Sequence, residues 1–300
     1  MKDLRLSILL TLSFCSSASF IAAAEPSPVR AANAAPQLLA ESFKFTEGPI
    51  ADAKGNVYFT DQPNDRIMVW TTEGKLETFL QPSGRANGLY FDLQGNLLAC
   101  ADEKNQLWEI SPEKKVTVLV ENFGGKLLNG PNDLWVDPNG GIYFTDPFYK
   151  RDYWGRDNKE IEQENVYYLS PNRGSVKVVA KDFKRPNGIV GTPDGRTLYV
   201  ADLSGRETFS FKIGTNGELS ERKHFVGMGS DGMTLDEKGN VYLTGRGVTV
   251  FNSDGEKIDG ISIDEGWTAN VCFGGAGFDT LFITAMDSLY AVKMSVKGAR

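Results

Sequence analysis

Short apolar runs separated by turn residues recur along almost the whole chain. In one representative unit, Leu89-Tyr90-Phe91 precede the turn glycine Gly95, and the apolar run 97–101 follows it. Runs that are rich in β-branched and aromatic residues and bounded by turn formers are typical of β-strands. No long stretch shows the 3.6-residue apolar period of an amphipathic helix. The pattern therefore predicts an all-β protein built from short strands.

This unit recurs six times. Turn glycines follow one another at intervals of 40, 45, 55, 44 and 38 residues, at Gly55, Gly95, Gly140, Gly195, Gly239 and Gly277. Intervals of about 40–50 residues are those of propeller blades. Most units continue with a third and a fourth strand, as at 106–110 and 115–119. Six units of four antiparallel strands predict a six-bladed β-propeller.

The last unit is one strand short. Residues 281–285 and 288–294 supply its second and third strands, and the apolar segment 37–43 could complete it from the N-terminal side. Such closure leaves no unpaired sheet edge at the seam of the ring. We therefore expect residues 37–300 to form a single propeller domain.

The first 24 residues have the pattern of a cleaved signal peptide. Lys2 and Arg5 precede the short apolar run 6–14, and Ala22-Ala23-Ala24 supplies small residues for cleavage. The apolar run is too short for a membrane-spanning helix. Residues 25–36 are rich in alanine and proline and are expected to form a flexible linker. These features predict an exported protein, periplasmic or extracellular, with no membrane attachment after cleavage.

Composition narrows the classes of function. The net charge of −7 argues against nucleic-acid binding, which needs a basic face. His224 is the only histidine, it is expected on an outer strand, and the chain has no Gly-x-Ser-x-Gly motif, so a serine triad is disfavoured. Cys100 and Cys272 remain after residue 24 and are expected to be buried, unpaired thiols.

One polar side chain precedes each turn glycine, by eight residues in five units and by seven in the sixth. If the units surround an axis, these side chains point at a common centre. Glu47, Asn187 and Asp231, with Asn132 close by, then form an all-oxygen donor set of the kind that hard divalent cations prefer. The two other members are expected only to shape turns, as Asn before Gly often does. The six residues are Glu47, Asn87, Asn132, Asn187, Asp231 and Asn270.

The longest interval contains an insertion that follows the predicted strand ending at Asp146. Its first part, 147–155, is aromatic, and a charged run continues to Glu164. Loops that follow blade strands reach a face of the propeller and often carry specificity. Two interpretations are open: an aromatic lid over the centre of the ring, or a solvated insertion that packs its own aromatic side chains.

The motifs around these positions resemble the gluconolactonase / regucalcin (senescence marker protein) family, over about residues 40–295. Gly130 stands where the animal proteins carry Arg, so the bacterial gluconolactonase branch is the better match. The motifs are Phe45-Thr46-Glu47-Gly48-Pro49, Leu128-Asn129-Gly130-Pro131-Asn132-Asp133, Phe144-Thr145-Asp146-Pro147, Arg185-Pro186-Asn187-Gly188, Ser230-Asp231-Gly232-Met233 and Asn270-Val271-Cys272-Phe273-Gly274-Gly275.

The resemblance implies a central site for one divalent cation, most often Ca²⁺ and in some members Zn²⁺, Mn²⁺ or Mg²⁺, held by Glu47, Asn187 and Asp231. It implies hydrolysis of a sugar lactone, in which the cation polarises the carbonyl and water attacks. Asp231 is the first candidate for the base that accepts the proton of water, and Asp133 and Asp146 are alternatives. The candidates for further contact with the cation or the substrate are Asn132, Asn129 and Tyr149.

Other functions are compatible with the same pattern. One is a phosphotriesterase-like hydrolase that uses the same cation site, and another is an exported propeller that binds a partner and holds the ion for structure alone. A propeller without metal, similar to strictosidine synthase, is disfavoured because Glu47 and Asp231 are both acidic. The sequence leaves the lactone, the cation and the oligomeric state open.

Overall fold

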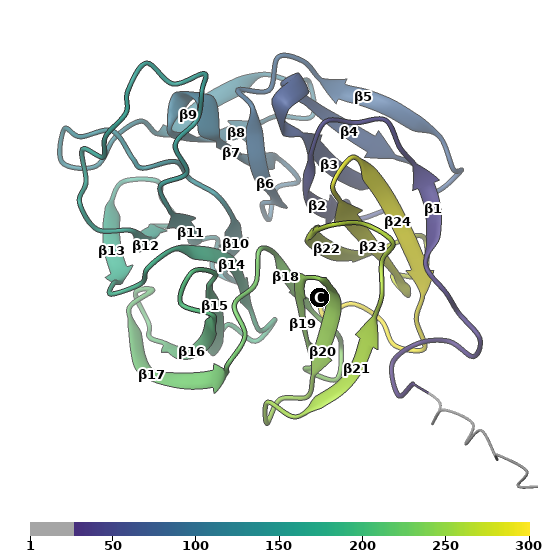
Figure 1. Ribbon diagram of the computed structural model, residues 1–300. Helices are drawn as coiled ribbons and strands as arrows, with labels where there is room; N and C mark the ends of the chain where they lie inside the picture. Colours follow the sequence, from purple (N-terminus) through teal and green to yellow (C-terminus); the bar gives the residue numbers. More distant parts are fainter. Residues whose placement is uncertain (1–26) are drawn as a thin grey trace, which may run out of the picture.

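Six antiparallel sheets of four strands each surround a central axis in residues 27–300, the part of the chain that the computed structural model describes (Figure 1). The six-bladed all-β propeller predicted from the repeats is confirmed. The predicted signal peptide, 1–24, lies outside the described residues. Within 27–300 the helices are two three-residue 3-10 turns, η1 (Gln62–Asn64) and η2 (Asp102–Lys104). No helix of this part is long and apolar enough to cross a membrane.

Blades 1 to 5 follow the chain in order, each with its first strand innermost. Blade 1 comprises β2 (Thr46–Ala51), β3 (Val57–Asp61), β4 (Arg66–Trp70) and β5 (Leu76–Leu80). Blade 2 comprises β6 (Ala86–Phe91), β7 (Leu97–Ala101), β8 (Gln106–Ile110) and β9 (Val116–Val120). Blade 3 comprises β10 (Leu134–Val136), β11 (Ile142–Asp146), β12 (Asn165–Leu169) and β13 (Val176–Ala180). Blade 4 comprises β14 (Pro186–Gly191), β15 (Thr197–Asp202), β16 (Glu207–Ile213) and β17 (Leu219–Val226), and blade 5 comprises β18 (Met233–Leu235), β19 (Val241–Gly245), β20 (Gly247–Phe251) and β21 (Lys257–Ile261).

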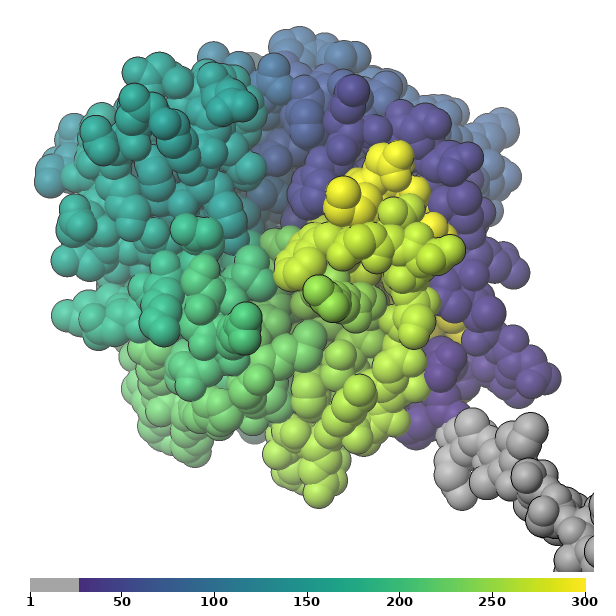
Figure 2. Space-filling view, viewed as in Figure 1, coloured from purple at the N-terminus to yellow at the C-terminus, as the bar shows by residue number. Residues whose placement is uncertain are grey.

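Blade 6 is closed by the N-terminal part of the chain. Its strands β22 (Thr268–Gly274), β23 (Thr280–Ala285) and β24 (Ser288–Lys293) are joined by β1 (Gln37–Ala40), in the order β1-β24-β23-β22. In Figure 2 the purple N-terminal segment lies against the yellow C-terminal strands. The predicted closure is thereby confirmed, and it leaves every blade with four strands.

The segment expected to be a flexible linker, 25–36, is packed against the propeller over its described part, 27–36. Val29 is 1% exposed and belongs to the apolar cluster between blades 5 and 6. Arg30 binds Asp259 through an ion pair of 2.8 Å between Nε and Oδ2. The expectation was wrong for these residues, because Val29 and Arg30 bind the propeller although the composition of the segment is typical of a linker.

The hairpin turn between the first two strands of each blade uses the predicted glycine in five blades. In blade 1, the Asp52 carboxylate accepts hydrogen bonds from the N–H groups of Lys54 and Asn56, and Gly55 adopts a φ of +91°. The sixth turn differs from the prediction. Its left-handed positions are Gly275 and Phe278, so Gly277 is not the turn glycine there.

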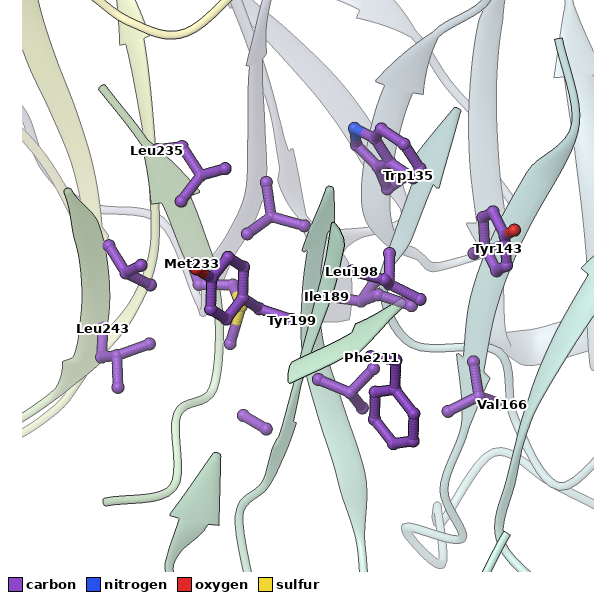
Figure 3. Close-up of a cluster of buried hydrophobic side chains, with 14 of the residues drawn as sticks. Trp135, Tyr143, Val166, Ile189, Leu198, Tyr199, Phe211, Met233, Leu235 and Leu243 are labelled. Atoms are coloured by element: carbon purple, nitrogen blue, oxygen red, sulfur yellow. The ribbon is translucent and has the colours of Figure 1, made fainter. Parts of the chain in front are cut away.

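Apolar side chains of neighbouring blades pack against each other around the axis. In Figure 3, Trp135, Ile189 and Met233 extend from the inner strands of blades 3, 4 and 5 into one cluster. Cys100 and Cys272 are buried free thiols in two other clusters, as predicted. His224 lies exposed on β17, the outermost strand of blade 4, where the sequence placed it.

Candidate functional site

The six polar residues at the predicted offset lie at the beginning of an inner strand or, for Asn132 and Asp231, two residues before it, and we call them the spoke residues. All six are buried. In blades 1, 2, 4 and 6 the pairing between the first and second strands shifts register next to the spoke residue. Such bulges re-aim a side chain away from the regular alternation of a strand. The spoke residues are Glu47, Asn87, Asn132, Asn187, Asp231 and Asn270.

The glycine that follows a spoke residue lets neighbouring inner strands approach closely. A Cβ on Gly48 would lie 2.2 Å from the backbone oxygen of Asn87, and one on Gly232 would lie 1.9 Å from Cγ of Asn270. At the glycine that follows these spoke residues, only a residue without a side chain fits between the neighbouring inner strands. Asn87 and Asn270 lie inside strands β6 and β22, so the expectation that they shape turns was wrong.

A threonine from the preceding blade fixes the backbone of the next inner strand. Thr60 Oγ1 donates to the backbone oxygen of Asn87 at 3.1 Å, and Thr145 Oγ1 donates to that of Asn187 at 2.8 Å. Thr244 bonds Ala269 in the same way. These bonds between blades set the position of the spoke residues relative to one another.

Asn187 and Asp231 are in direct contact at the centre of the ring. Nδ2 of Asn187 donates to Oδ1 of Asp231 at 2.7 Å and also to the Tyr149 hydroxyl at 2.9 Å. The indole N–H of Trp267 donates to the other oxygen of Asp231, Oδ2, at 2.6 Å. Three predicted site residues are thus brought together with Trp267, which carried no recognisable signal in the sequence.

Two further acids border the same centre. Gly48 N donates to Oε2 of Glu47 at 2.8 Å, and the charge of Asp231 raises the pKa of Glu47. Asn270 Nδ2 approaches Oδ2 of Asp133 at 3.5 Å. Asn270 is therefore a member of the site, and its position seven residues before Gly277 was the sequence signal that could have included it.

Burial in the ring raises the pKa of every carboxyl group at its centre. Desolvation is the largest cause for each, and it brings the pKa of Asp231 to about 6 and that of Asp133 to about 7. The pKa of Glu47 lies well above its usual range because of burial and the charge of Asp231. Hydrogen bonds from Trp267 and Asn187 lower the pKa of Asp231 again.

The insertion after β11 combines both interpretations offered by the sequence. It leaves the blade at the end where the spoke residues lie, since Asn132 N bonds the backbone oxygen of Thr145 at 2.9 Å. Tyr149 reaches Asn187, whereas Phe148 and Trp154 pack on each other with ring centroids 5.6 Å apart. The insertion is therefore a self-packed segment with one side chain in the site.

Asn132 and Asn129 occupy different surroundings. Asn132 is buried at its spoke position, and its side-chain amide makes no hydrogen bond within residues 27–300. Asn129 instead points its amide nitrogen at the backbone oxygen of Gln163, 3.0 Å away, and so fastens the end of the insertion. The structure shows Asn129 holding this loop, and shows it in no contact with Asp231.

A cavity of about 570 Å³ lies on the axis beyond the spoke residues. Leu89, Ile189 and Met233 line it, each two positions after a spoke residue, together with the hairpin turns at the opposite end of the blades. Asp133 and Asn270 border this cavity, but the three predicted cation ligands do not. The cluster of polar groups belongs to the end of the ring that carries the insertion, and the cavity is apolar for most of its length.

Comparison with known proteins identifies the family. The profile of the SMP-30/Gluconolactonase/LRE-like region matches residues 45–287. The chain belongs to the SMP-30/gluconolactonase family. Among its relatives is a gluconolactonase of Zymomonas mobilis, 30% identical over 293 residues, which cover 87% of this chain and 82% of the relative. A lactonohydrolase of Aspergillus oryzae is 26% identical and covers 62% of this chain and 49% of its own length.

Solved structures of SMP-30/gluconolactonase proteins have the same architecture. A gluconolactonase from Xanthomonas campestris superposes with a TM-score of 0.82 at 30% identity, covering 88% of this chain and 91% of its own. Regucalcin from Agrobacterium tumefaciens, a calcium-binding protein, superposes with a TM-score of 0.74 at 19% identity, covering 88% and 95%. The second likeness concerns the fold alone.

The SMP-30/gluconolactonase fold raises the question of whether these residues suit a divalent cation. Within residues 27–300, no three histidine, cysteine, aspartate or glutamate side chains are grouped so that they could hold a metal ion by themselves. The predicted set differs from such a group because it has two carboxylates, Glu47 and Asp231, and one amide. Both hydrogen bonds of the Asn187 side chain leave from Nδ2, so they leave its oxygen uncommitted. Two buried carboxyl groups, whose pKa values are raised by desolvation and, for Glu47, also by the charge of Asp231, fit a hard cation together with an amide oxygen.

Proposed function

We propose that this chain is a lactonase that opens a sugar lactone at the centre of the ring, with one divalent cation as cofactor and Ca²⁺ as its first candidate. One observation carries the proposal. Glu47, Asn187 and Asp231 come from three different blades and lie buried close together, in a chain that is 30% identical to a gluconolactonase. A structural role alone would not need two buried carboxylates at one point.

Glu47, Asn187 and Asp231 would hold the cation, which when bound supplies polarisation of the lactone carbonyl. Asn132, with its unengaged amide, is the next candidate to touch the cation or the substrate. Two carboxylates approximately offset the charge of a divalent ion, which makes their burial favourable.

Asp231 is proposed as the general base. Its position carries this role, because it lies beside the other proposed cation ligands, where a water molecule and the lactone carbonyl would meet. Trp267 and Asn187 bind its two oxygens and fix the plane of the carboxylate. A water molecule loses a proton to Asp231 as it attacks the carbonyl carbon, the ring C–O bond breaks, and the leaving alkoxide takes that proton from Asp231 to give the hydroxy acid.

The alternative bases are not equivalent. Asp146 accepts hydrogen bonds from the N–H groups of Asn129 and Gly130 with its two oxygens, at 2.9 and 2.8 Å, and so has a structural task. Asp133 borders the centre with a pKa of about 7 and remains the alternative to Asp231.

The test combines metal analysis with turnover of a panel of lactones by the wild type and Asp231→Asn. We expect close to one bound cation in the wild type, and in the variant a loss of cation together with a fall in kcat of about 10²–10⁴-fold. Asp236→Asn is the matched control, since Asp236 is a buried carboxylate of a hairpin turn at the other end of the same blade. A wild type without cation, or a fully active Asp231→Asn, contradicts the proposal.

The same panel separates the other hydrolase. A phosphotriester added to it is expected to be a poor substrate beside glucono-δ-lactone. Faster hydrolysis of the phosphotriester would favour a phosphotriesterase, and cation binding without turnover of any ester would favour a binding module with a structural ion.

We further propose that the protein is exported. The charged, apolar and small-residue pattern of residues 1–24 supports this. Expression of the full chain in a bacterial host followed by N-terminal sequencing is expected to find the mature protein outside the cytoplasm, starting near Glu25. Retention of residues 1–24 in the cytoplasm would contradict it.

A further inference from the structure

The aspartate that ends the second strand has the same task in three blades. Its carboxylate accepts hydrogen bonds from the two backbone N–H groups that lie three and two residues before the spoke residue. In blade 4, Asp202 binds the N–H groups of Lys184 and Arg185 at 2.8 and 2.9 Å. The equivalents are Asp61 with Lys44 and Phe45, and Asp146 with Asn129 and Gly130.

Blade 2 departs from this arrangement. The equivalent position is Ala101, which pairs with Ala86 as Asp61 pairs with Thr46, and another carboxylate holds the loop before the spoke residue. Oδ1 of Asp65 accepts from the N–H groups of Ser83 and Arg85 at 2.9 and 2.7 Å. Asp102, the first residue after β7, is 3% exposed and is therefore a buried carboxylate that takes no part in holding this loop.

Most partners of Asp102 belong to the insertion that follows β11, and Nε2 of Gln62 in blade 1 also donates to Oδ2 of Asp102 at 3.2 Å. Oδ2 of Asp102 accepts a hydrogen bond from Arg151 Nε at 2.9 Å and another from the Tyr153 hydroxyl. The backbone oxygen of Asp102 accepts from the indole N–H of Trp154 at 2.9 Å. Three of four consecutive residues of the insertion are thus fastened to one residue of the neighbouring blade.

The same contacts lead to the site. The Arg151 guanidinium lies 5.4 Å from the centre of the Tyr149 ring, and that of Arg185 lies 4.7 Å from it. The Tyr149 hydroxyl is bound by Asn187. A continuous chain of contacts therefore runs from Asp102 through Arg151 and Tyr149 to a proposed cation ligand.

We propose that Asp102 is a positioning residue, which with Arg151 and Tyr153 forms a clasp that holds the insertion so that Tyr149 closes on Asn187 at the mouth of the site. The clasp determines the affinity for the lactone, a statement that rests on the proposed function. It acts through Arg151 and Tyr149, and Asp102 itself touches no reacting atom.

The clasp is held by charge, so a neutral substitute should open it without removing the blade. Asp102→Asn keeps the shape of the side chain but leaves the guanidinium of Arg151, whose side chain is 24% exposed, without its carboxylate. Breaking one partner of a largely buried pair costs more than removing both. The blade keeps its four strands, because no backbone ladder depends on this carboxylate.

The experiment compares Asp102→Asn with Asp92→Asn, a matched control in the same blade. Asp92 is also buried, but it holds the hairpin turn at the other end through the N–H groups of Gln94 and Asn96. The first measurement is the rate of trypsin cleavage within residues 147–164. We expect this rate to rise about tenfold in Asp102→Asn, because the segment opens locally, and to stay unchanged in Asp92→Asn.

The second measurement is lactone kinetics. In Asp102→Asn we expect KM to rise about tenfold while kcat stays within about twofold, because ground-state contacts are lost and the base is untouched. Arg151→Ala should have the same effect. The double variant should add little to it, since both changes break the same contact, the one between Asp102 and Arg151. Tyr153→Phe, which removes one hydroxyl, keeps the test available if Asp102→Asn fails to fold.

Unchanged cleavage and unchanged KM in Asp102→Asn would overturn the clasp, and so would an equal effect of Asp92→Asn. Additive effects of Asp102→Asn and Arg151→Ala would also contradict it. If the wild type hydrolyses no lactone, the proposed function fails, and the cleavage rates still decide whether Asp102 holds the insertion.

Discussion

Two carboxylates that repel each other are kept at one point by the residues around them. Asp231 is held by Trp267 and Asn187, and Glu47 by the N–H of Gly48. These hydrogen bonds only partly offset desolvation, because the pKa of both groups remains raised. At the scale of single residues, the site is therefore under electrostatic strain that a bound cation would relieve.

This strain predicts how stability depends on pH. The pKa of Asp231 is 3.8 in the unfolded reference and about 6 when folded, so between these values the cation-free folded protein holds a proton that the unfolded chain has released. The cation-free protein therefore loses stability as pH rises through this window. We expect the gain in Tm on replacing EDTA by excess Ca²⁺ to be small at pH 5 and large at pH 8.

Thermal unfolding at both pH values measures this gain. Asp231→Asn is expected to reduce it at pH 8, while Asp236→Asn keeps it. The same gain at pH 5 and pH 8 in the wild type would show that Asp231 and Glu47 do not bind the cation.

The sequence identified part of this residue-scale arrangement. Glu47, Asn187 and Asp231 could be selected because an acid or amide at a constant offset from a glycine is rare by chance. Trp267 could not be selected, since it lies in the connection between blades 5 and 6, where no periodic position marks it. Asn270 also stands at a fixed distance before a glycine, but it was assigned to a turn, because an asparagine near a glycine is commonly a turn residue.

At the scale of elements, the inner strands are as close to one another as glycine allows. Gly48 and Gly232 leave no room for a Cβ beside the next spoke residue. The bulges change the direction of the spoke side chains, and the threonines hydrogen-bond one blade to the next. Both features also position the inner strands relative to one another. The convergence of six side chains thus depends on how the strands approach, more than on the strands' own sequences.

Gly232→Ala tests this close approach. Its Cβ would overlap Asn270 at 1.9 Å, so we expect a loss in the free energy of unfolding of about 1–3 kcal/mol, as for overpacking, and a displaced site. Denaturant unfolding measures the loss. Gly227→Ala is the control, because a Cβ there meets nothing within 4 Å, and equal stability of the two variants would contradict the prediction.

Most predicted strands agree with the structure to within one or two residues because apolar runs and turn glycines mark them, but the closing segment 37–43 is a strand only over Gln37–Ala40. The sixth hairpin was not, since its left-handed positions are divided between Gly275 and Phe278, and a phenylalanine gives no turn signal. The task of Asp102 was also hidden. In the sequence Asp102 looks like the aspartates that end the second strands of blades 1, 3 and 4, and only the strand pairing places it one residue beyond their position.

At the scale of the whole molecule, the ring is held shut by segments from its two ends. β1 pairs with β24, and before it Val29 and Arg30 attach the chain to blades 5 and 6. The sequence indicated the closing strand, because a blade lacking one strand demands a partner. The sequence did not indicate that residues 27–36 attach to blades 5 and 6, because this attachment depends on the part of the folded surface that the segment contacts.

Truncation separates the two contributions. A chain starting at Gln37 lacks Val29 and the Arg30–Asp259 ion pair, and we expect its Tm to fall by about 5 °C, as for the loss of one buried aliphatic side chain with a modest ion pair. A chain starting at Lys44 lacks β1 as well, and the exposed edge of β24 should make it aggregate. Thermal unfolding and size-exclusion chromatography check both, and a soluble, cooperatively folding chain from Lys44 would contradict the role of β1.

The closure also sets an order of events in time. Gln37 and Ala291 pair although more than 250 residues separate them, and contacts between such distant segments form slowly. Glu47 from the first blade meets Asp231 and Asn270 from the last two only when the circle is complete. A refolding chain can therefore regain most of its sheets while it has no site at all, and its chemistry begins at the last step of folding.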